Sequence, residues 1–568
     1  MKRWVLALIC AIFGLALLFC GLLVPMHLQA VDVGVIQRAG KDTSTVVVHG
    51  MNWVSGENWG AAQMLMDAST GVVGRNSLAI AITNLDQQHL ELISWGGGDP
   101  RFRALFKPDS KKLRTGSDPF ARYVLRLENR GRLLDFLRAS TRSDVKELLR
   151  CRELKETAIF DPSLSSSGQA FDAALTLCGL LMEGGRLNPR LNETVYLLAI
   201  KANRNEGSRE LEALLLDLTS LAQRMNWGQL TVFVSKISTS DTLHILADQA
   251  RKARADLDLA QIFAAVCLTG KPAAVANYLA NFSQTGLDDM GLTLRFGAGA
   301  VNELLQRNQR LHVSSWRMRM GTIPPFGLFL RFAADLCWLA SALGFALKWL
   351  FILASGFLFA LTLHFCKPSA TDLERPLQVR GLHLIREFLF ALGFLLMVLI
   401  LSEPFLAQKS QKVENAFRLR VPTVGAVVSA GKIGAASTIM NQLNVLTLLV
   451  FFVLQGLIYT ACLVKLAEIR RQNVPPRLKL KLLDNEDHLF DAGLYLGFVG
   501  TIISLILVSL GIIEFSLMAA YSSTSFGIIF VSIFKIFHLR GTRRKLLLEV
   551  EAGIAMSEHQ SAQAALPS

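Results

Sequence analysis

Residues 492–540 read AGLYLGFVGTIISLILVSLGIIEFSLMAAYSSTSFGIIFVSIFKIFHLR, two apolar segments separated by a short connection at Glu514. Each segment holds close to the ~20 apolar residues that a helix needs to cross a bilayer. Small and hydroxyl residues recur along one side of both segments at helical spacing, which lets two helices approach closely in lipid. They are Gly493, Gly497, Gly500, Thr501 and Ser504, then Ser516, Ala520, Ser523, Thr524 and Gly527. The pattern predicts a tightly packed membrane hairpin.

The whole chain has the composition of a membrane protein. Of its 568 residues, 51% are hydrophobic and only 18% are charged, whereas soluble domains average about 25% charged residues. Six apolar runs are long enough to cross a membrane, at 4–24, 345–365, 388–406, 443–464, 489–512 and 515–537. We therefore expect a mainly α-helical, polytopic membrane protein with about six spans.

The chain has a net charge of +14, and many of its Lys and Arg residues flank these apolar runs. With the N-terminus inside, 17 Lys and Arg residues fall in the cytoplasmic segments and five in the outer loop 408–442. This asymmetry follows the positive-inside rule, so both termini are predicted in the cytoplasm and residues 31–325 outside it. No basic run is interleaved with aromatic residues, and we expect no nucleic-acid partner.

The spans divide the chain into seven segments. Residues 1–25 are a membrane anchor or a signal sequence, and 326–344, with Arg331 and Asp335 on one face, form an interfacial amphipathic helix. Residues 345–407 are a membrane helix pair, 443–549 a second membrane domain and 550–568 a disordered cytoplasmic tail. The predicted cellular location is a bacterial inner membrane, with residues 31–325 in the periplasm.

The predicted extracytoplasmic domain, 31–325, has apolar residues at helical spacing between 125 and 311. Short helices separated by turns favour stacked helix pairs, an α-solenoid, although no strict repeat aligns. Periodicity leaves 46–48, 78–82 and 90–95 open between short strands and buried helix pieces.

The sequence of this domain contains no recognisable catalytic or metal-binding motif. Its three cysteines form no CxxC motif, its histidines no HExxH pair, and no GxSxG element occurs. The glycine run 96–98 lacks the Lys-Ser/Thr ending of a phosphate loop. We expect no enzyme, no cofactor and no metal site, and a binding role for the helical surface.

Two interpretations of the hairpin hydroxyls remain open. They either pack the helices together or face a polar pore, and Thr501, Thr524, Ser504 and Ser523 are the candidates for an ion path. Neither span carries an acid within the membrane, so a partner would have to supply a proton-carrying carboxylate.

Two short motifs resemble those of the MotA/TolQ/ExbB proton-channel family. Residues 497–501, GFVGT, are similar to its G-L-x-G-T element, and 524–527, TSFG, to its T-A-x-G element. The resemblance implies a homo-oligomer, a pentamer in this family, around a small single-span partner like ExbD, TolR or MotB whose membrane Asp carries the proton. It also implies that Thr501 and Thr524 lie near the ion path.

The same resemblance makes Gly497, Gly500 and Gly527 close-packing glycines. The motifs cover about 50 residues, and the wider likeness is confined to 443–549. Ser504 stands where the family commonly has Gly. Ala519 stands where the TolQ and ExbB branch has Glu, so no role transfers to that position.

An acidic cluster precedes the fifth span: Asp484, Glu486, Asp487 and Asp491. Acids at a helix N-terminus are stabilised by the helix dipole. Proton exit and contact with a basic neighbour are the alternatives.

The favoured hypothesis is an energy-transducing subunit that couples ion flow to work in the cell envelope, with an outer domain that binds an unknown envelope component. The alternative is a non-conducting membrane scaffold whose outer domain recruits envelope partners. An anchored periplasmic enzyme is a third hypothesis without catalytic residues to support it.

Overall fold

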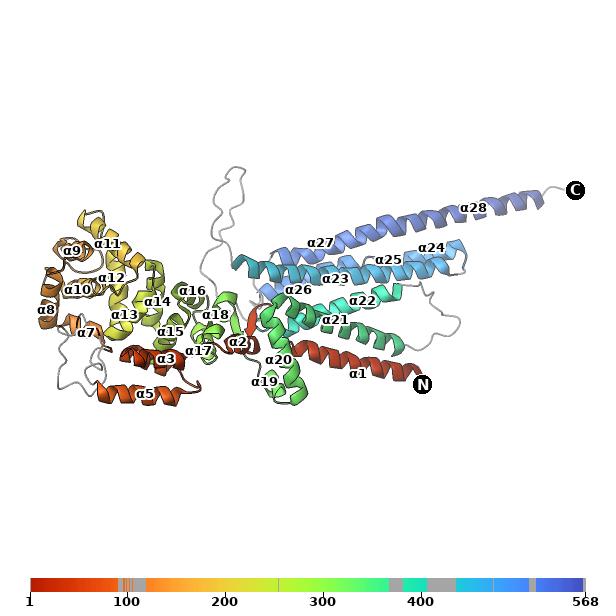
Figure 1. Cartoon of the computed structure of the whole chain (residues 1–568). Helices are drawn as coiled ribbons and strands as arrows, with labels where there is room; N and C mark the ends of the chain where they lie inside the picture. Colours follow the sequence, from red (N-terminus) through yellow and green to blue (C-terminus); the bar gives the residue numbers. More distant parts are fainter. Residues whose placement is uncertain are drawn as a thin grey trace. The chain divides into compact units, whose positions relative to one another are not determined.

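The computed structural model describes residues 2–89, 96–97, 99, 102, 105, 119–253, 255–366, 382–405, 436–472, 474–509 and 517–564. For residue 2 and for 382–386, 400, 436–450, 503–509, 517–522 and 553–564 it describes the backbone alone. The described chain is mainly helical, which confirms the predicted class, with one two-stranded sheet (Figure 1). It divides into two units: Val31–Ser314, which we call the outer unit after its predicted location, and Met1–Ala30 with Ser315–Ser568, which we call the membrane unit.

The outer unit is built from short helices. Strands β1 (Ala30–Asp32) and β2 (Arg310–His312) pair where the chain enters and leaves the unit. Its helices are α2 (Val33–Gly40), α3 (Val46–Ser55), α4 (Trp59–Ala68), α5 (Arg75–Gln88), α7 (Phe120–Leu125), α8 (Leu127–Arg138), α9 (Ser143–Arg150), η1 (Cys151–Glu153), α10 (Gln169–Glu183), α11 (Pro189–Asn203), α12 (Arg209–Ala222), α13 (Trp227–Lys236), α14 (Ser240–Lys252), α15 (Asp256–Thr269), α16 (Pro272–Asn281), α17 (Gly286–Leu294) and α18 (Ala298–Arg307).

Packing resolves the segments that periodicity left open. Residues 46–48 and 78–82 are helical, in α3 and α5, and Leu78 is fully buried against Gly50. The stretch 90–95 lies outside the described residues. Along the unit, α10 packs on α12, α12 on α14 and α14 on α16. This next-but-one packing suits stacked helix pairs, and the solenoid stays a prediction.

Helix α10 is the centre of the outer core. All of its residues from Phe171 to Met182 are buried, as expected of a helix surrounded by others. Asp172 is the charged residue in this run, and it pairs with Arg130 at 2.8 Å and Arg152 at 2.6 Å. The buried carboxylate is thus neutralised by two guanidinium groups from neighbouring elements.

The membrane unit is a row of long helices. Its elements are α1 (Lys2–Leu23), α19 (Ser315–Gly321), α20 (Pro324–Leu339), α21 (Ser341–Cys366), α22 (Leu382–Ser402), α23 (Ala436–Arg471), α24 (Pro476–Asn485), α25 (Asp487–Phe490), α26 (Ala492–Ser509), α27 (Leu517–Ile533), the π-helix η3 (Phe534–Leu539) and α28 (Arg540–Ala564). Helix α1 packs on α21, α21 on α22, α22 on α23, and α27 on both α23 and α26 (Figure 1).

Four stretches of the described chain are long and apolar enough to cross a membrane: Arg3–Leu23, Ser341–Cys366, Phe451–Arg471 and Ser523–Ala552. Two shorter apolar stretches, Glu387–Leu399 and Ala492–Ile502, overlap two further predicted spans, 388–406 and 489–512. The four long stretches agree with a membrane protein, and the total of six spans stays a prediction.

Several predicted boundaries move. The outer unit ends at Ser314 rather than 325, because α19 packs on α20 and Arg317 contacts His27, both in the membrane unit. The amphipathic helix ends at Leu339, and the next helix begins at Ser341 rather than 345. Helix α23 begins at Ala436, within the expected loop 408–442, of which 408–435 lie outside the described residues.

The C-terminal segment also differs from its prediction. Disorder was expected from residue 550, whereas helix α28 continues to Ala564. The stretch 550–564 is rich in Ala, Glu and Gln and contains no Pro, so its residues favour a helix.

Glu212 holds a loop onto α12. Its carboxylate accepts hydrogen bonds from the backbone N–H groups of Ala158, Ile159 and Phe160 at 2.6–2.8 Å. Burial raises the pKa of this carboxyl, but the hydrogen bonds from Ala158, Ser208 and the other two amides outweigh it and hold the pKa below its ordinary value. The ionised form is therefore the one that the fold stabilises.

Substituting Glu212→Gln should loosen this loop by about 2 kcal/mol at neutral pH, because buried N–H groups lose a charged acceptor. Amide hydrogen exchange of 158–160, followed by mass spectrometry on the full chain, measures the effect. A lowered folded-state pKa gives stabilisation that is complete above the unfolded value of about 4.3 and is lost as pH falls through the folded value, so the two proteins should converge in acid.

The control is Glu210→Gln on the same helix, because Glu210 is exposed and pairs only with Lys201 at the surface in the described contacts. Such a pair contributes about 0–1 kcal/mol. Equal exchange at 158–160 in both variants would contradict the role given to Glu212.

Candidate functional site

The predicted hairpin helices meet along a line that we call the seam, formed by α26 and α27 where Gly497, Gly500 and Gly527 lie. A Cβ at Gly497 would lie 2.8 Å from the carbonyl oxygen of Ser523, and one at Gly500 2.5 Å from the Ser523 hydroxyl. A Cβ at Gly527 would lie 2.7 Å from the carbonyl oxygen of Gly493. The three glycines that the sequence singled out thus all lie where the helices touch.

The two predicted threonines face each other across the seam. The Thr501 and Thr524 hydroxyls are hydrogen-bonded, and both lie within reach of the Gly497 carbonyl oxygen, at 3.0 and 3.3 Å. Ser523 is buried beside them, with 1% of its surface exposed. Ser504 belongs to α26, and its side chain lies outside the described residues.

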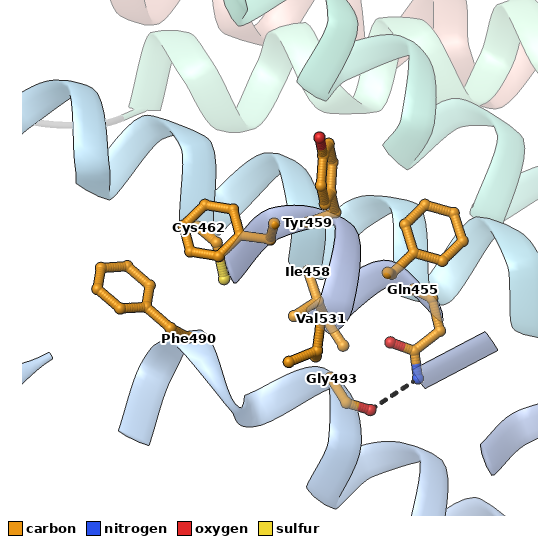
Figure 2. Close-up of a pocket in the computed structure, with 9 residues that line it drawn as sticks. Gln455, Ile458, Tyr459, Cys462, Phe490, Gly493 and Val531 are labelled. Atoms are coloured by element: carbon orange, nitrogen blue, oxygen red, sulfur yellow. Dashed lines mark hydrogen bonds between the residues drawn. The ribbon is translucent and has the colours of Figure 1, made fainter. Parts of the chain in front are cut away.

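A third helix, α23, contributes a residue that the sequence analysis missed. The Gln455 side chain is buried, and its Nε2 donates to the carbonyl oxygen of Gly493 at 2.9 Å (Figure 2). A Cβ at Gly493 would lie 2.8 Å from Gln455 Oε1, so this glycine makes room for the amide. An amide near the middle of the apolar run 443–464 was the available signal, because polar groups within spans are costly.

Gln455 lines a small pocket between α23, α26 and α27 (Figure 2). Tyr459 and Cys462 line it from α23 and Val531 from α27. The Tyr459 hydroxyl contacts His538 Nε2 at 2.9 Å. The pocket is therefore mostly apolar, with the Gln455 amide at one side.

The acidic cluster meets basic residues from other elements. Lys535 Nζ lies 2.7 Å from Asp491 and 4.0 Å from Asp487. Arg543 pairs with Asp484 and Lys465 with Glu486, the second at 3.8 Å. Of the interpretations left open by the sequence, contact with basic neighbours is the one that these distances support.

The side of the hairpin away from the seam is apolar and exposed. Phe498 and Ile502 on α26, and Ile528 and Ile529 on α27, are all at least two-fifths exposed. Such side chains suit lipid tails or a neighbouring membrane helix.

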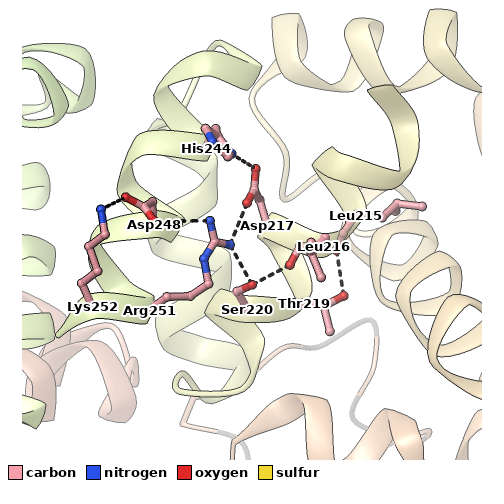
Figure 3. A network of polar contacts seen from close by, with 9 residues as sticks. All are labelled: Leu215, Leu216, Asp217, Thr219, Ser220, His244, Asp248, Arg251 and Lys252. Atoms are coloured by element: carbon pink, nitrogen blue, oxygen red, sulfur yellow. Dashed lines mark hydrogen bonds and ion pairs between the residues drawn. The ribbon is translucent and has the colours of Figure 1, made fainter. Parts of the chain in front are cut away.

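The outer unit contains a polar network around Asp217, on α12 (Figure 3). His244 Nδ1 and Arg251 Nη1, both on α14, lie 2.9 and 2.8 Å from the two oxygens of the buried Asp217 carboxylate. Arg251 also donates to the Ser220 hydroxyl at 3.0 Å, and Ser220 to the carbonyl oxygen of Leu216. The network joins α12 to α14, and its serine hydroxyl is engaged in structural hydrogen bonds.

Two thiols of the outer core are poor nucleophiles. Burial raises the pKa of Cys151 and of Cys178 to about 12, and the thiolate is the reactive form of cysteine. Among the described residues, no group of three or more His, Cys, Asp or Glu side chains is arranged to hold a metal ion.

Substituting Gly497→Ala should lower the thermal unfolding temperature in detergent, since the added methyl group meets the backbone of α27. We expect a loss of about 1–3 kcal/mol, the usual cost of overpacking. The control is Gly541→Ala in α28, where the added Cβ meets no atom within 4 Å. That variant should be neutral or up to about 1 kcal/mol more stable. Equal behaviour of the two variants would contradict the close approach at Gly497.

Comparison of the chain with family models, curated proteins and solved structures gives no match. The functional argument therefore rests on the residues of the seam and on the motif resemblance that they carry.

Proposed function

We propose that the chain is an inner-membrane subunit resembling the MotA/TolQ/ExbB proton channels. It forms a homo-oligomer around a small single-span partner with a membrane Asp and couples ion flow to work in the cell envelope. The observation that carries the proposal is the hydrogen-bonded pair Thr501 and Thr524, held at the seam by glycines. A hydroxyl pair in an apolar hairpin is the feature that can exchange hydrogen bonds with a passing proton carrier.

The exposed apolar surface opposite the seam supports assembly. Phe498 and Ile529 lie on this surface, one from each helix. Because lipid gives no hydrophobic advantage to helix association, contacts with neighbouring copies depend on packing. In the proposed oligomer this surface contacts lipid and neighbouring subunits.

The proposed topology has six spans with both termini in the cytoplasm. The distribution of Lys and Arg supports it. In this arrangement the Asp491–Lys535 pair lies at the cytoplasmic end of the seam, and the outer unit is periplasmic. Its stacked short helices act as an α-solenoid that binds an envelope component.

Helix α1 is proposed to stay attached to the mature protein as a membrane anchor. Buried Lys348 on α21 donates to the carbonyl oxygen of Met26 at 2.5 Å, and buried Ser355 to that of Gly14 at 2.7 Å. The Glu403 carboxylate accepts from the Leu28 N–H at 2.9 Å. Cleavage after residue 30 would remove these partners from three buried polar groups, at the usual cost of desolvation without compensation.

A second candidate function is a non-conducting membrane scaffold. It is favoured by the fact that Thr501 and Thr524 bond each other and Gly497 within one chain, as hydroxyls that only pack helices do. In this alternative the hairpin oligomerises and the outer unit recruits envelope partners.

Proton flux distinguishes the two functions. Vesicles containing the chain with its co-purified partner should conduct protons, and the double variant Thr501→Val, Thr524→Val should lose about tenfold or more, since about 1.4 kcal/mol per tenfold is comparable to one lost hydrogen bond. Valine keeps the shape of threonine, so packing is preserved.

The matched control is Thr362→Val on α21, whose hydroxyl donates to the carbonyl oxygen of Leu358 in its own helix. It should leave the flux unchanged. No flux in the unsubstituted complex would favour the scaffold, and normal flux in the double variant would remove the hydroxyls from the path.

Retention of α1 has its own measurement. Mass spectrometry of the protein purified from membranes should recover peptides from the segment 4–30. A mature N-terminus at residue 31 would show that α1 is removed and that the contacts of Lys348 and Ser355 belong to the precursor only.

A further inference from the structure

Polar contacts occur at three successive levels along the seam. They are, in order, the Thr501–Thr524 pair, the Gln455–Gly493 hydrogen bond and the Asp491–Lys535 ion pair. At a rise of about 1.5 Å per residue, Gly493 lies about 6 Å along α26 from Gly497, where the threonines bond, and about 3 Å from Asp491. The middle level therefore separates the hydroxyl pair from the ion pair.

Gln455 is only half satisfied at this middle level. Its side chain is 1% exposed and its Nε2 donates to Gly493. Its Oε1 has no hydrogen-bond partner within the part of the chain that the structure describes. Burying an acceptor without a hydrogen-bond partner destabilises a protein by about 1–3 kcal/mol. We therefore expect a donor to bind at this oxygen.

The residues that line the pocket indicate which kind of hydrogen-bond donor can bind there. Gln455 and Gly493 both line it, whereas the other polar groups there are engaged, Tyr459 with His538 and Cys462 with the carbonyl oxygen of Leu489. Among the described residues that line the pocket, none carries a charged side chain, which disfavours a metal cation or an anion. A small neutral donor fits, and water is the smallest.

We propose that this pocket binds a water molecule that donates a hydrogen bond to Gln455 Oε1, the buried acceptor without a partner. Through this water the seam becomes a polar path from the threonine pair toward the Asp491–Lys535 pair. The inference rests on the proposed function for its role in conduction, and on the Gln455 amide alone for the water.

The water is tested by radiolytic hydroxyl-radical labelling of the full chain in lipid nanodiscs, with mass spectrometry of the oxidised residues. A bound water generates radicals beside Cys462 and Tyr459, so both should be oxidised in the unsubstituted protein. Gln455→Leu, of similar size but without the acceptor, should lower their oxidation by about tenfold, as expected for a lost buried hydrogen bond.

Two further variants keep this test decisive. Gln455→Met replaces Gln455→Leu if that variant fails to elute as a folded protein. Gln472→Leu makes the same chemical change just beyond α23, outside the pocket lining, and should label like the unsubstituted protein. Equal oxidation of Cys462 with and without the Gln455 amide would overturn the bound water.

Proton flux through the partner complex then tests the path. If the unsubstituted complex conducts, Gln455→Leu should reduce the flux by about tenfold, by the same reasoning. Unchanged flux together with reduced labelling would overturn the path while the water stands. Absence of flux in every protein together with reduced labelling would remove the proposed function and the path, and leave the water site established.

Discussion

Helices α26 and α27 approach each other so closely that a Cβ has no room at Gly497, Gly500 or Gly527. The site depends on this close approach. It brings two threonine hydroxyls within hydrogen-bonding distance and lets the Gln455 amide from α23 reach the carbonyl oxygen of Gly493. In lipid, helices gain little from hydrophobic burial, so such close packing and interhelical hydrogen bonds are what hold them together. The contacts that stabilise the hairpin are thus also the ones that place polar groups along the seam.

The other half of the membrane unit is held by buried polar groups at the ends and faces of its helices. Lys348 and Ser355 donate to backbone carbonyls of the N-terminal segment, and Arg317 contacts His27. A charged group with so little exposure needs a specific partner, because water is not there to solvate it. Helix α1 is therefore packed as an integral part of the unit, and the row from α1 to α27 is continuous through α21, α22 and α23.

The outer unit is stabilised in a different way, by an apolar core with a few neutralised charges. Asp172 lies between Arg130 and Arg152, Asp217 between His244 and Arg251, and Glu212 receives three backbone amides. Each carboxylate joins two or more elements, and each is fully engaged in doing so. These acids therefore hold neighbouring helices and loops of the unit together.

The sequence by itself determined what depends on neighbours along the chain. Apolar runs placed the membrane helices, and the i, i+4 spacing of Gly493 and Gly497 placed the face on which α26 packs. The sequence left residues 46–48 and 78–82 undecided between strand and helix, and the structure shows both to be helical, with Leu78 packed against Gly50. The partners of Gly493 and Asp491 lie 38 and 44 residues away, at Gln455 and Lys535. Only tertiary structure decided those pairs, because the partner of a polar group is set by which helix faces it, and local periodicity carries no information about that.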